Sequence, residues 1–315
     1  MLLRFTLDLA TEFFFGTTVH SQRYSSQAPG PDNDGMFPWK GLGEDFDAAT
    51  KHVQNRFRLL KFYWLHNPKS FRENIKQVHR FADFCIRDAI QRANQRNPIE
   101  MRSQSLNILF AGRDTTASLV SWSFWLLAKH PSIYNELRGH VLKHFGPYEE
   151  TNRITFATLK SCEYLQYVMK EVLQLYPPTP INSRTAIRDT TLPLGGGPDG
   201  KSPIVVRKGQ TVIYYIHITQ SLNDFWGPDA DTFDPSRWAH YKYNGAYLPF
   251  NAGPRICLGQ QFALTQAGYI LTRMVQKFDQ AKLADPDMVP THKLGATDAP
   301  SDYMIYFHQA PTGDN

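Results

Sequence analysis

Residues 250–259 read FNAGPRICLG, in which one cysteine stands between two glycines shortly before a long helical pattern. Cys257 offers a thiolate, a soft metal ligand whose charge is stabilised when a helix N-terminus points at it. Gly253 and Gly259 allow the backbone to approach a flat ligand and to adopt unusual φ and ψ angles. Arg255 can form a forked pair of hydrogen bonds with a carboxylate. A buried cysteine in a Gly/Pro turn is the simpler interpretation, but it accounts for neither the glycines nor the arginine.

The same stretch indicates haem as the ligand. A cysteine thiolate can hold haem iron, Arg255 can bind a haem propionate, and Phe250 can cover the loop and exclude water. The pattern F-x-x-G-x-R-x-C-x-G resembles the cysteine loop of cytochrome P450 monooxygenases at every position. This resemblance implies haem b as the cofactor, with Cys257 as the axial ligand of the iron and with Phe250, Gly253, Arg255 and Gly259 around the cofactor.

Composition limits the class of protein. The chain has 315 residues, of which 42% are hydrophobic, so it can bury a sizeable core. Its net charge of +5 is spread along the chain, which suits an acidic protein partner or an anionic membrane and argues against nucleic acid. The three cysteines lie far apart without C-x-x-C spacing, which argues against disulfides and a zinc site.

Periodicity predicts a mainly α-helical protein with a small β portion. Asp8 and Glu12 interrupt the first apolar run, so we interpret it as an amphipathic helix and not as a signal peptide or membrane span. The predicted helices cover 1–16, 44–66, 69–92, 100–129, 131–145, 155–176 and 257–277, and a polar loop covers 25–38. Strands are predicted at 184–194 and 204–213, joined by a glycine-rich turn at 195–200, and at 303–308. That turn lacks the Lys-Ser/Thr of a phosphate-binding loop.

The helix predicted at 100–129 carries Ala111, Gly112, Asp114 and Thr115 in the run AGRDTT. This run matches the oxygen-activation segment of the same family. Small residues at 111 and 112 leave a gap against the haem for dioxygen and substrate, Thr115 can hydrogen-bond the dioxygen, and Asp114 can relay protons. The simpler interpretation is a buried helix with a glycine-induced bend and threonines bonded to their own backbone. The cysteine loop further along the chain favours the catalytic interpretation.

A third family landmark, E-x-x-R, is altered in this chain. Glu171 is present, but Gln174 stands where the family has an arginine, while Arg237 in FDPSRW matches the segment that supplies the second arginine. In the family these three residues lock the segment that carries the cysteine loop. We expect Glu171 to pair with Arg237 and Gln174 to donate an amide hydrogen bond to Glu171. Breaking a buried charge network costs about 3–5 kcal/mol, so this departure bears on folding and haem retention.

Arg184 ends the stretch PTPINSR at 178–184 and occupies the place of a propionate-binding arginine in the family. It resembles a second haem anchor beside Arg255. A surface arginine at a strand end is an equally good interpretation, and the sequence leaves both open.

The segments 5–13, 109–117 and 190–193 are similar to fungal microsomal enzymes that hydroxylate n-alkanes and fatty acids. That resemblance implies a haem-thiolate monooxygenase that inserts one atom of O₂ into an aliphatic C–H bond. It also implies a hydrophobic substrate, electrons from NADPH-cytochrome P450 reductase, and a place on the cytosolic face of the endoplasmic reticulum membrane.

We expect residues 1–315 to form a single partial cytochrome P450 domain, incomplete at its N-terminus and without the membrane anchor. Residues 1–180 would be mostly helical, 181–256 β-rich with the family's irregular meander, and 257–315 the cysteine helix and a C-terminal β segment. The alternative is a truncated, non-catalytic haem-binding or interaction fragment of the family. A third possibility, a peroxygenase or hydroperoxide-rearranging enzyme, is disfavoured by Thr115, because such enzymes need no oxygen-activating alcohol.

Overall fold

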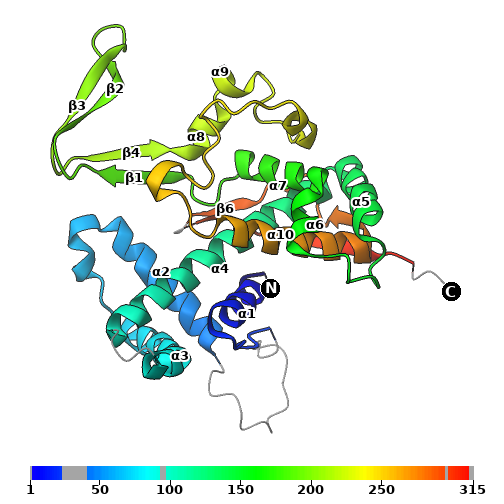
Figure 1. Cartoon of the computed structure of the whole chain (residues 1–315), viewed down its shortest axis with the longest axis horizontal. Coiled ribbons are helices and arrows are strands. Elements are labelled where there is room, and N and C mark those ends of the chain that lie inside the picture. Colours follow the sequence, from blue (N-terminus) through cyan, green and yellow to red (C-terminus); the bar gives the residue numbers. More distant parts are fainter. Residues whose placement is uncertain (1, 23–40, 93–96, 295–296, 312–315) are drawn as a thin grey trace.

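The computed structural model describes residues 2–22, 41–92, 97–294 and 297–311. The chain is mainly helical, with four two-stranded sheets, which confirms the predicted fold class (Figure 1). None of the helices in the described ranges is long and apolar enough to cross a membrane. The first half contains α1 (Leu2–Phe15), α2 (Leu42–Arg58), the 3₁₀ helix η1 (Leu60–Leu65), α3 (Lys69–Arg92), α4 (Pro98–Lys129), α5 (Pro131–Phe145), α6 (Phe156–Ser161) and α7 (Glu163–Leu175).

The second half begins with the strands and ends with the cysteine helix and short strands. Its elements are β1 (Ile181–Thr185), β2 (Thr190–Gly196), β3 (Ser202–Val206), β4 (Thr211–Tyr215), α8 (Ile216–Ser221), α9 (Asn223–Trp226), η2 (Pro235–Ala239), η3 (Gly253–Arg255), α10 (Gln260–Lys277), β5 (Phe278–Leu283), β6 (Thr291–Leu294), β7 (Asp298–Ser301) and β8 (Ile305–Gln309).

Helix α4 is the central element of the fold. Its start is set by Asn97, whose side chain accepts a hydrogen bond from the Ile99 amide at 3.0 Å, and by Pro98 in the first turn. Its C-terminal half is almost entirely buried, whereas its N-terminal half is largely open. In Figure 1, α4 runs from the α2–α3 group at one side to α7 and α10 at the other. Both groups of helices therefore use α4 as common support.

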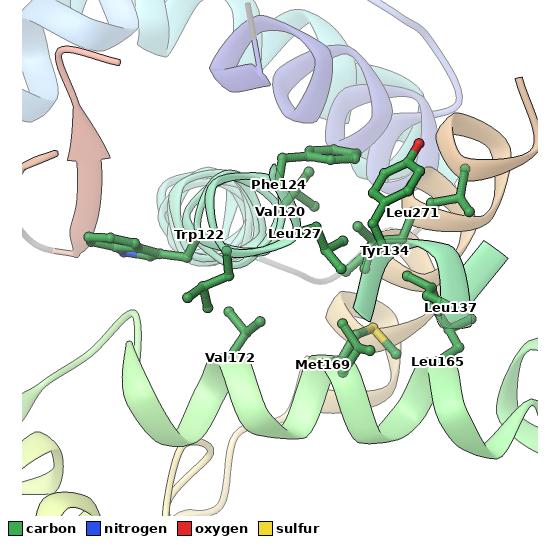
Figure 2. Packing of buried hydrophobic residues seen from close by; sticks show 14 of the residues in the cluster. Val120, Trp122, Phe124, Leu127, Tyr134, Leu137, Leu165, Met169, Val172 and Leu271 are labelled. Atoms are coloured by element: carbon green, nitrogen blue, oxygen red, sulfur yellow. The ribbon is translucent and has the colours of Figure 1, made fainter. Parts of the chain in front are cut away.

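The main core lies around the C-terminal half of α4. Figure 2 shows Leu127 of α4 facing side chains of α5, α7 and α10, among them Met169 and Leu271, while Trp122 points the other way, toward His292 of β6. Trp122 also stacks on Tyr176 just after α7, with ring centroids 3.9 Å apart. Burial of these large apolar side chains is the main stabilising contribution to the fold.

A second, smaller core joins α1, α2 and α3 to the N-terminal half of α4, around Leu7, Phe81 and Leu109. Arg113 of α4 is buried beside it. Its Nε donates to the Leu3 carbonyl at 3.1 Å, and its guanidinium pairs with Asp47. This arginine ties α4 to α1 and α2.

The predicted strands are present but are divided differently. Each of the two predicted strands is broken into two, so that β1 pairs with β4 and β2 pairs with β3, both antiparallel. The β2–β3 hairpin extends away from the body of the molecule, beyond β1 and β4 (Figure 1). Near the C-terminus, β8 confirms the predicted strand, but it pairs with β5, and the sequence did not indicate β5, β6 or β7.

Three helix boundaries differ from prediction. The predicted 44–66 helix ends at Arg58 and continues as η1, and the predicted 155–176 helix is split at Cys162 into α6 and α7. Thr155 and Thr158 form a capping box at the start of α6. The cysteine helix begins at 260 and not at 257, which leaves Cys257 in the loop before it. The predicted loop at 25–38 lies outside the described residues, and the division of the chain at 180 and 256 stays a prediction.

Candidate functional site

The cysteine loop is held closed by its own backbone. The Cys257 amide donates to the Phe250 carbonyl at 2.9 Å, so the loop's two ends are joined. Gly253 has a φ of +72°, a left-handed conformation that favours glycine. Gly259 has an ordinary φ of −86°, and a Cβ there would lie 4.0 Å from the Cys257 sulfur. Gly253 is therefore needed for the turn, while Gly259 leaves space beside the thiol.

The face of the loop that carries the thiol is open. Cys257 is exposed, and its neighbours Ile256 and Leu258 have exposed fractions of 52% and 96%. Phe250, predicted to cover the loop, is half-buried against the main core. Exposed apolar side chains on both sides of a potential metal ligand indicate a surface that an apolar group covers.

Helix α10 brings this loop close to α4. Phe262, in the first turn of α10, lies 4.4 Å from Phe13 and 5.1 Å from Phe14 between ring centroids. A Cβ at Gly112 would lie 3.5 Å from Phe14 and 3.7 Å from Phe262. Gly112 thus packs against the rings of α1 and α10, whereas Ala111 is exposed. The open space predicted at both small residues is present only at Ala111.

Thr115 and Asp114 are neighbours with different surroundings. The Thr115 hydroxyl donates to the Ala111 carbonyl at 2.7 Å, one turn back along α4. Asp114 is buried, and its Oδ1 lies 3.5 Å from Arg113 without a hydrogen bond. Burial raises the pKa of Asp114, and Asp47 adds to the rise, while Arg113 and Lys293 oppose it.

Asp114 lies at the edge of a groove with a volume of about 1390 Å³. The groove runs between α1, α2, α4, α10 and the C-terminal strands, and Ser118 and Ser121 continue its α4 side. Neither Thr115 nor Cys257 lines it. Asp114 and Thr115, which were predicted to act together, thus lie on different sides of α4, and only Asp114 lines the groove.

Glu171 of α7 is fully buried and accepts three hydrogen bonds. Its donors are Arg237 Nε at 3.0 Å, the Asp234 amide at 2.9 Å and Trp238 Nε1 at 2.7 Å. The predicted ion pair with Arg237 is present. Burial raises the pKa of Glu171 to about 7, and the three donors oppose that rise. Trp238, which the sequence analysis did not single out, completes the set of partners.

The prediction for Gln174 is wrong. Its amide does not donate to Glu171 but to the carbonyls of Gln220 at 2.5 Å and Ala230 at 3.1 Å. These carbonyls face the side chain across the buried end of α7, and its own Oε1 has no hydrogen-bond partner within the described residues. Gln174 therefore belongs to a neutral network beside the Glu171 ion pair.

The two predicted anchoring arginines are both exposed. Arg255 lies in η3, and Arg184 of β1 donates to Asn182 Oδ1 at 3.1 Å and to the Ser183 carbonyl at 2.8 Å. Neither forms an ion pair with a carboxylate among the residues that the structure describes. Both guanidinium groups can therefore donate hydrogen bonds to an anionic group.

Asn251 joins β1 and β4 to the cysteine loop. Its Oδ1 accepts hydrogen bonds from Tyr214 at 2.8 Å and from Asn182 Nδ2 at 3.3 Å, and its φ is +58°. The sequence analysis missed these three residues. An asparagine two positions before Gly253 was a usable signal, because asparagine tolerates the left-handed region better than most residues.

The donor set fits haem. A thiol offers one soft ligand to iron, and two guanidinium groups without carboxylate partners can bind two propionates. Clusters of three or more His, Cys, Asp or Glu that could hold a bare metal ion are absent from the described ranges. A single thiolate is sufficient only for a metal that is already held by another ligand, such as a porphyrin.

Comparisons with known proteins agree with this geometry. The cytochrome P450 family model matches residues 25–307. The chain is 42% identical to cytochrome P450 monooxygenase g430 of Fusarium sp, over 92% of the chain and 55% of that relative. It is also 42% identical to cytochrome P450 52A13 of Debaryomyces hansenii and to cytochrome P450 52A3-A of Candida maltosa, over 93% and 94% of the chain and 61% of each relative. The chain thus spans little more than half the length of these relatives, and it belongs to the cytochrome P450 family.

Proposed function

We propose that this chain is the haem-thiolate part of a monooxygenase that hydroxylates an aliphatic C–H bond. The observation that carries the proposal is the exposed Cys257 thiol, presented by a closed loop just before α10, the helix whose Phe262 packs against Gly112 of α4. Cys257 would hold the iron of haem b, and Arg255 and Arg184 would bind its propionates. Phe250, Gly253 and Gly259 would shape the loop around the cofactor, Ala111 would leave space for dioxygen and substrate, and Gly112 would pack against Phe14 and Phe262.

Haem, when bound, supplies the oxidising chemistry: one atom of O₂ enters the substrate, and the other leaves as water with two electrons and two protons. The protein's part is to deliver protons. The raised pKa of Asp114 favours a protonated carboxyl, which can give up its proton and then be reprotonated from the groove. The Thr115 hydroxyl must release the Ala111 carbonyl before it can donate to dioxygen. Asp114 and Thr115 are therefore the proposed catalytic residues.

Substrate and partners follow from the resemblance to fungal n-alkane and fatty-acid hydroxylases. We take the substrate to be such a hydrophobic molecule and the electron donor to be NADPH-cytochrome P450 reductase. The net charge of +5 suits an acidic partner. The proposed location is the cytosolic face of the endoplasmic reticulum membrane.

The test is reconstitution of the purified chain with haem, followed by reduction and addition of carbon monoxide. We expect the red-shifted Soret band of a thiolate-ligated haem. Cys257→Ser should abolish this band, and the matched control Cys85→Ser, at a half-buried cysteine of α3, should retain it. An unchanged spectrum in Cys257→Ser would remove Cys257 from the site.

The second candidate function is a non-catalytic interaction fragment of the family. The exposure of Ile256 and Leu258 favours it, because a protein partner can cover an apolar surface as well as a cofactor can. Soluble chain that takes up no haem on reconstitution would support this candidate and reject the monooxygenase.

A further inference from the structure

Gln220, at the end of α8, is fully buried and uses both ends of its amide. Its Nε2 donates to the carbonyls of Leu173 at 2.9 Å and Gln174 at 3.0 Å, which are left free at the C-terminus of α7. Its Oε1 accepts from the Leu248 amide at 2.8 Å. One side chain therefore joins the end of α7 to the segment that enters the cysteine loop.

From Leu248 the connection continues to the thiol through the backbone. The Leu248 carbonyl accepts from the Asn251 amide at 3.0 Å, and the Phe250 carbonyl accepts from the Cys257 amide at 2.9 Å. Leu248, where the chain enters the loop, is thus bonded to Gln220, and Cys257 at the end of the loop is bonded to Phe250 at its start. Movement of Leu248 would be transmitted directly to the backbone of Cys257.

Gln174 fixes Gln220 in return. The Gln174 side chain donates to the Gln220 carbonyl at 2.5 Å, while the Gln220 side chain donates to the Gln174 carbonyl at 3.0 Å. Both side chains are fully buried, so neither exchanges these bonds for water. The pair is uncharged and separate from the Glu171–Arg237 ion pair.

We propose that Gln220, held in place by Gln174, is the positioning residue that fixes the entry of the cysteine loop and thereby the backbone of Cys257. The proposal rests on the proposed function, because it gives Gln220 a role in presenting the thiol to haem iron. It concerns the loop itself and can be measured in the haem-free chain.

The experiment measures amide hydrogen exchange in the haem-free full chain with Gln220→Met, which keeps the length of the side chain but removes its hydrogen bonds. The matched control is Gln276→Met. Gln276 is equally buried, and its amide donates to the carbonyls of Gly146 at 2.8 Å and Pro147 at 3.2 Å, away from the loop. In Gln220→Met we expect protection of the Leu248, Asn251 and Cys257 amides to fall by about tenfold or more. In the control, protection of these amides should change by less than about threefold.

Two results would overturn the proposal: unchanged protection of the three amides in Gln220→Met, or an equal loss in the control. If Gln220→Met does not fold, Gln220→Glu carries the test, because its protonated carboxyl can still accept from Leu248 and donate to one carbonyl. In Gln220→Glu, protection of the same three amides should match that in the natural chain at acidic pH and should fall by about tenfold once the carboxyl ionises. Protection that does not depend on pH in this variant contradicts the proposal.

Reconstitution with haem separates this proposal from the proposed function. Loss of the red-shifted Soret band in Gln220→Met but not in Gln276→Met supports both. If the natural chain takes up no haem while the exchange result is as expected, the monooxygenase fails and the positioning role stands. If haem binds and the exchange is unaffected, the positioning role fails alone.

Discussion

In α7 the Glu171 carboxylate is fully buried and accepts three hydrogen bonds, whereas in the cysteine loop Leu258 is 96% exposed. We call Glu171 and its hydrogen-bond partners the back; it is a layer of buried polar groups that the chain itself supplies. We call the thiol face of the cysteine loop the front; there the exposed Cys257 lies between the exposed side chains of Ile256 and Leu258. The difference shows that the chain itself satisfies the buried polar groups around Glu171, while within the described residues it leaves the thiol face of the cysteine loop exposed. Stability and ligand binding should therefore respond to different substitutions.

The largest expected effect is on the back. Glu171→Gln removes the charge that Arg237 faces at 3.0 Å and replaces one acceptor oxygen with a donor. Arg237 would keep only Asp229, 3.5 Å away, as a carboxylate partner, so the free energy of unfolding should fall toward the lower end of about 3–5 kcal/mol in urea titrations of the haem-free chain. The control is Glu163→Gln, at an exposed position in the first turn of the same helix, and it should change the value by less than about 0.5 kcal/mol. Equal changes in the free energy of unfolding for the two substitutions would show that the buried Glu171 network does not stabilise the chain more than an exposed side chain does.

An intermediate effect is expected at Asp114, which is buried on α4 and lines the groove. Burial raises its pKa in the folded state, so its contribution to stability is fully present below about pH 3.8 and is lost as pH rises through the elevated value. Asp114→Asn should therefore raise the free energy of unfolding at pH 7.5 by about 1 kcal/mol, and by less at pH 4.5. Turnover of the haem-loaded enzyme should fall, because the amide cannot relay a proton.

Urea unfolding at the two pH values checks the Asp114 prediction, with the exposed Asp287→Asn as the control. A variant less stable than the natural chain at pH 7.5 would mean that the attraction between Asp114 and Arg113, 3.5 Å apart, outweighs burial.

The smallest effect is expected on the front. Leu258→Ser should change the free energy of unfolding of the haem-free chain by less than about 0.5 kcal/mol, because the side chain loses almost no burial. Leu271→Ala, at a fully buried leucine of α10, should cost about 2–5 kcal/mol in the same assay. A loss above about 1 kcal/mol in Leu258→Ser would show that the front is packed in solution, and the contrast between the two sides would not hold.

Local signals predicted much of the fold. Pro131 and apolar spacing predicted α5 at 131–145, which is its extent in the structure. The split at Cys162 and the short strands β5 to β7 were not predicted. The pairing of these strands depends on residues that are distant in sequence, such as Phe278 and Gln309. Short strands also have little periodicity of their own, so the sequence gives no clear signal for them.

The site was predicted unevenly for the same reason. Glu171 and Arg237 were expected to pair from the resemblance of their two motifs to the family, and the structure confirms the pair. The partners of Gln174 were not foreseen. An amide donates to any carbonyl within reach, and the two that it meets are 46 and 56 residues away.

The sequence by itself supplied the groups on which the proposed chemistry rests: a cysteine for a thiolate ligand, an acid beside an alcohol, two arginines for carboxylates, and their order along the chain. These follow from residue types and short spacings, which are local. Only the tertiary structure decided which groups are buried and which side of a helix each one faces. It placed Asp114 on a groove that Thr115 does not line, and it made Gln220 a partner of the cysteine loop. Burial and hydrogen-bond partners depend on segments far apart in the chain, and the packing of α4, α7 and α10 brings those segments together.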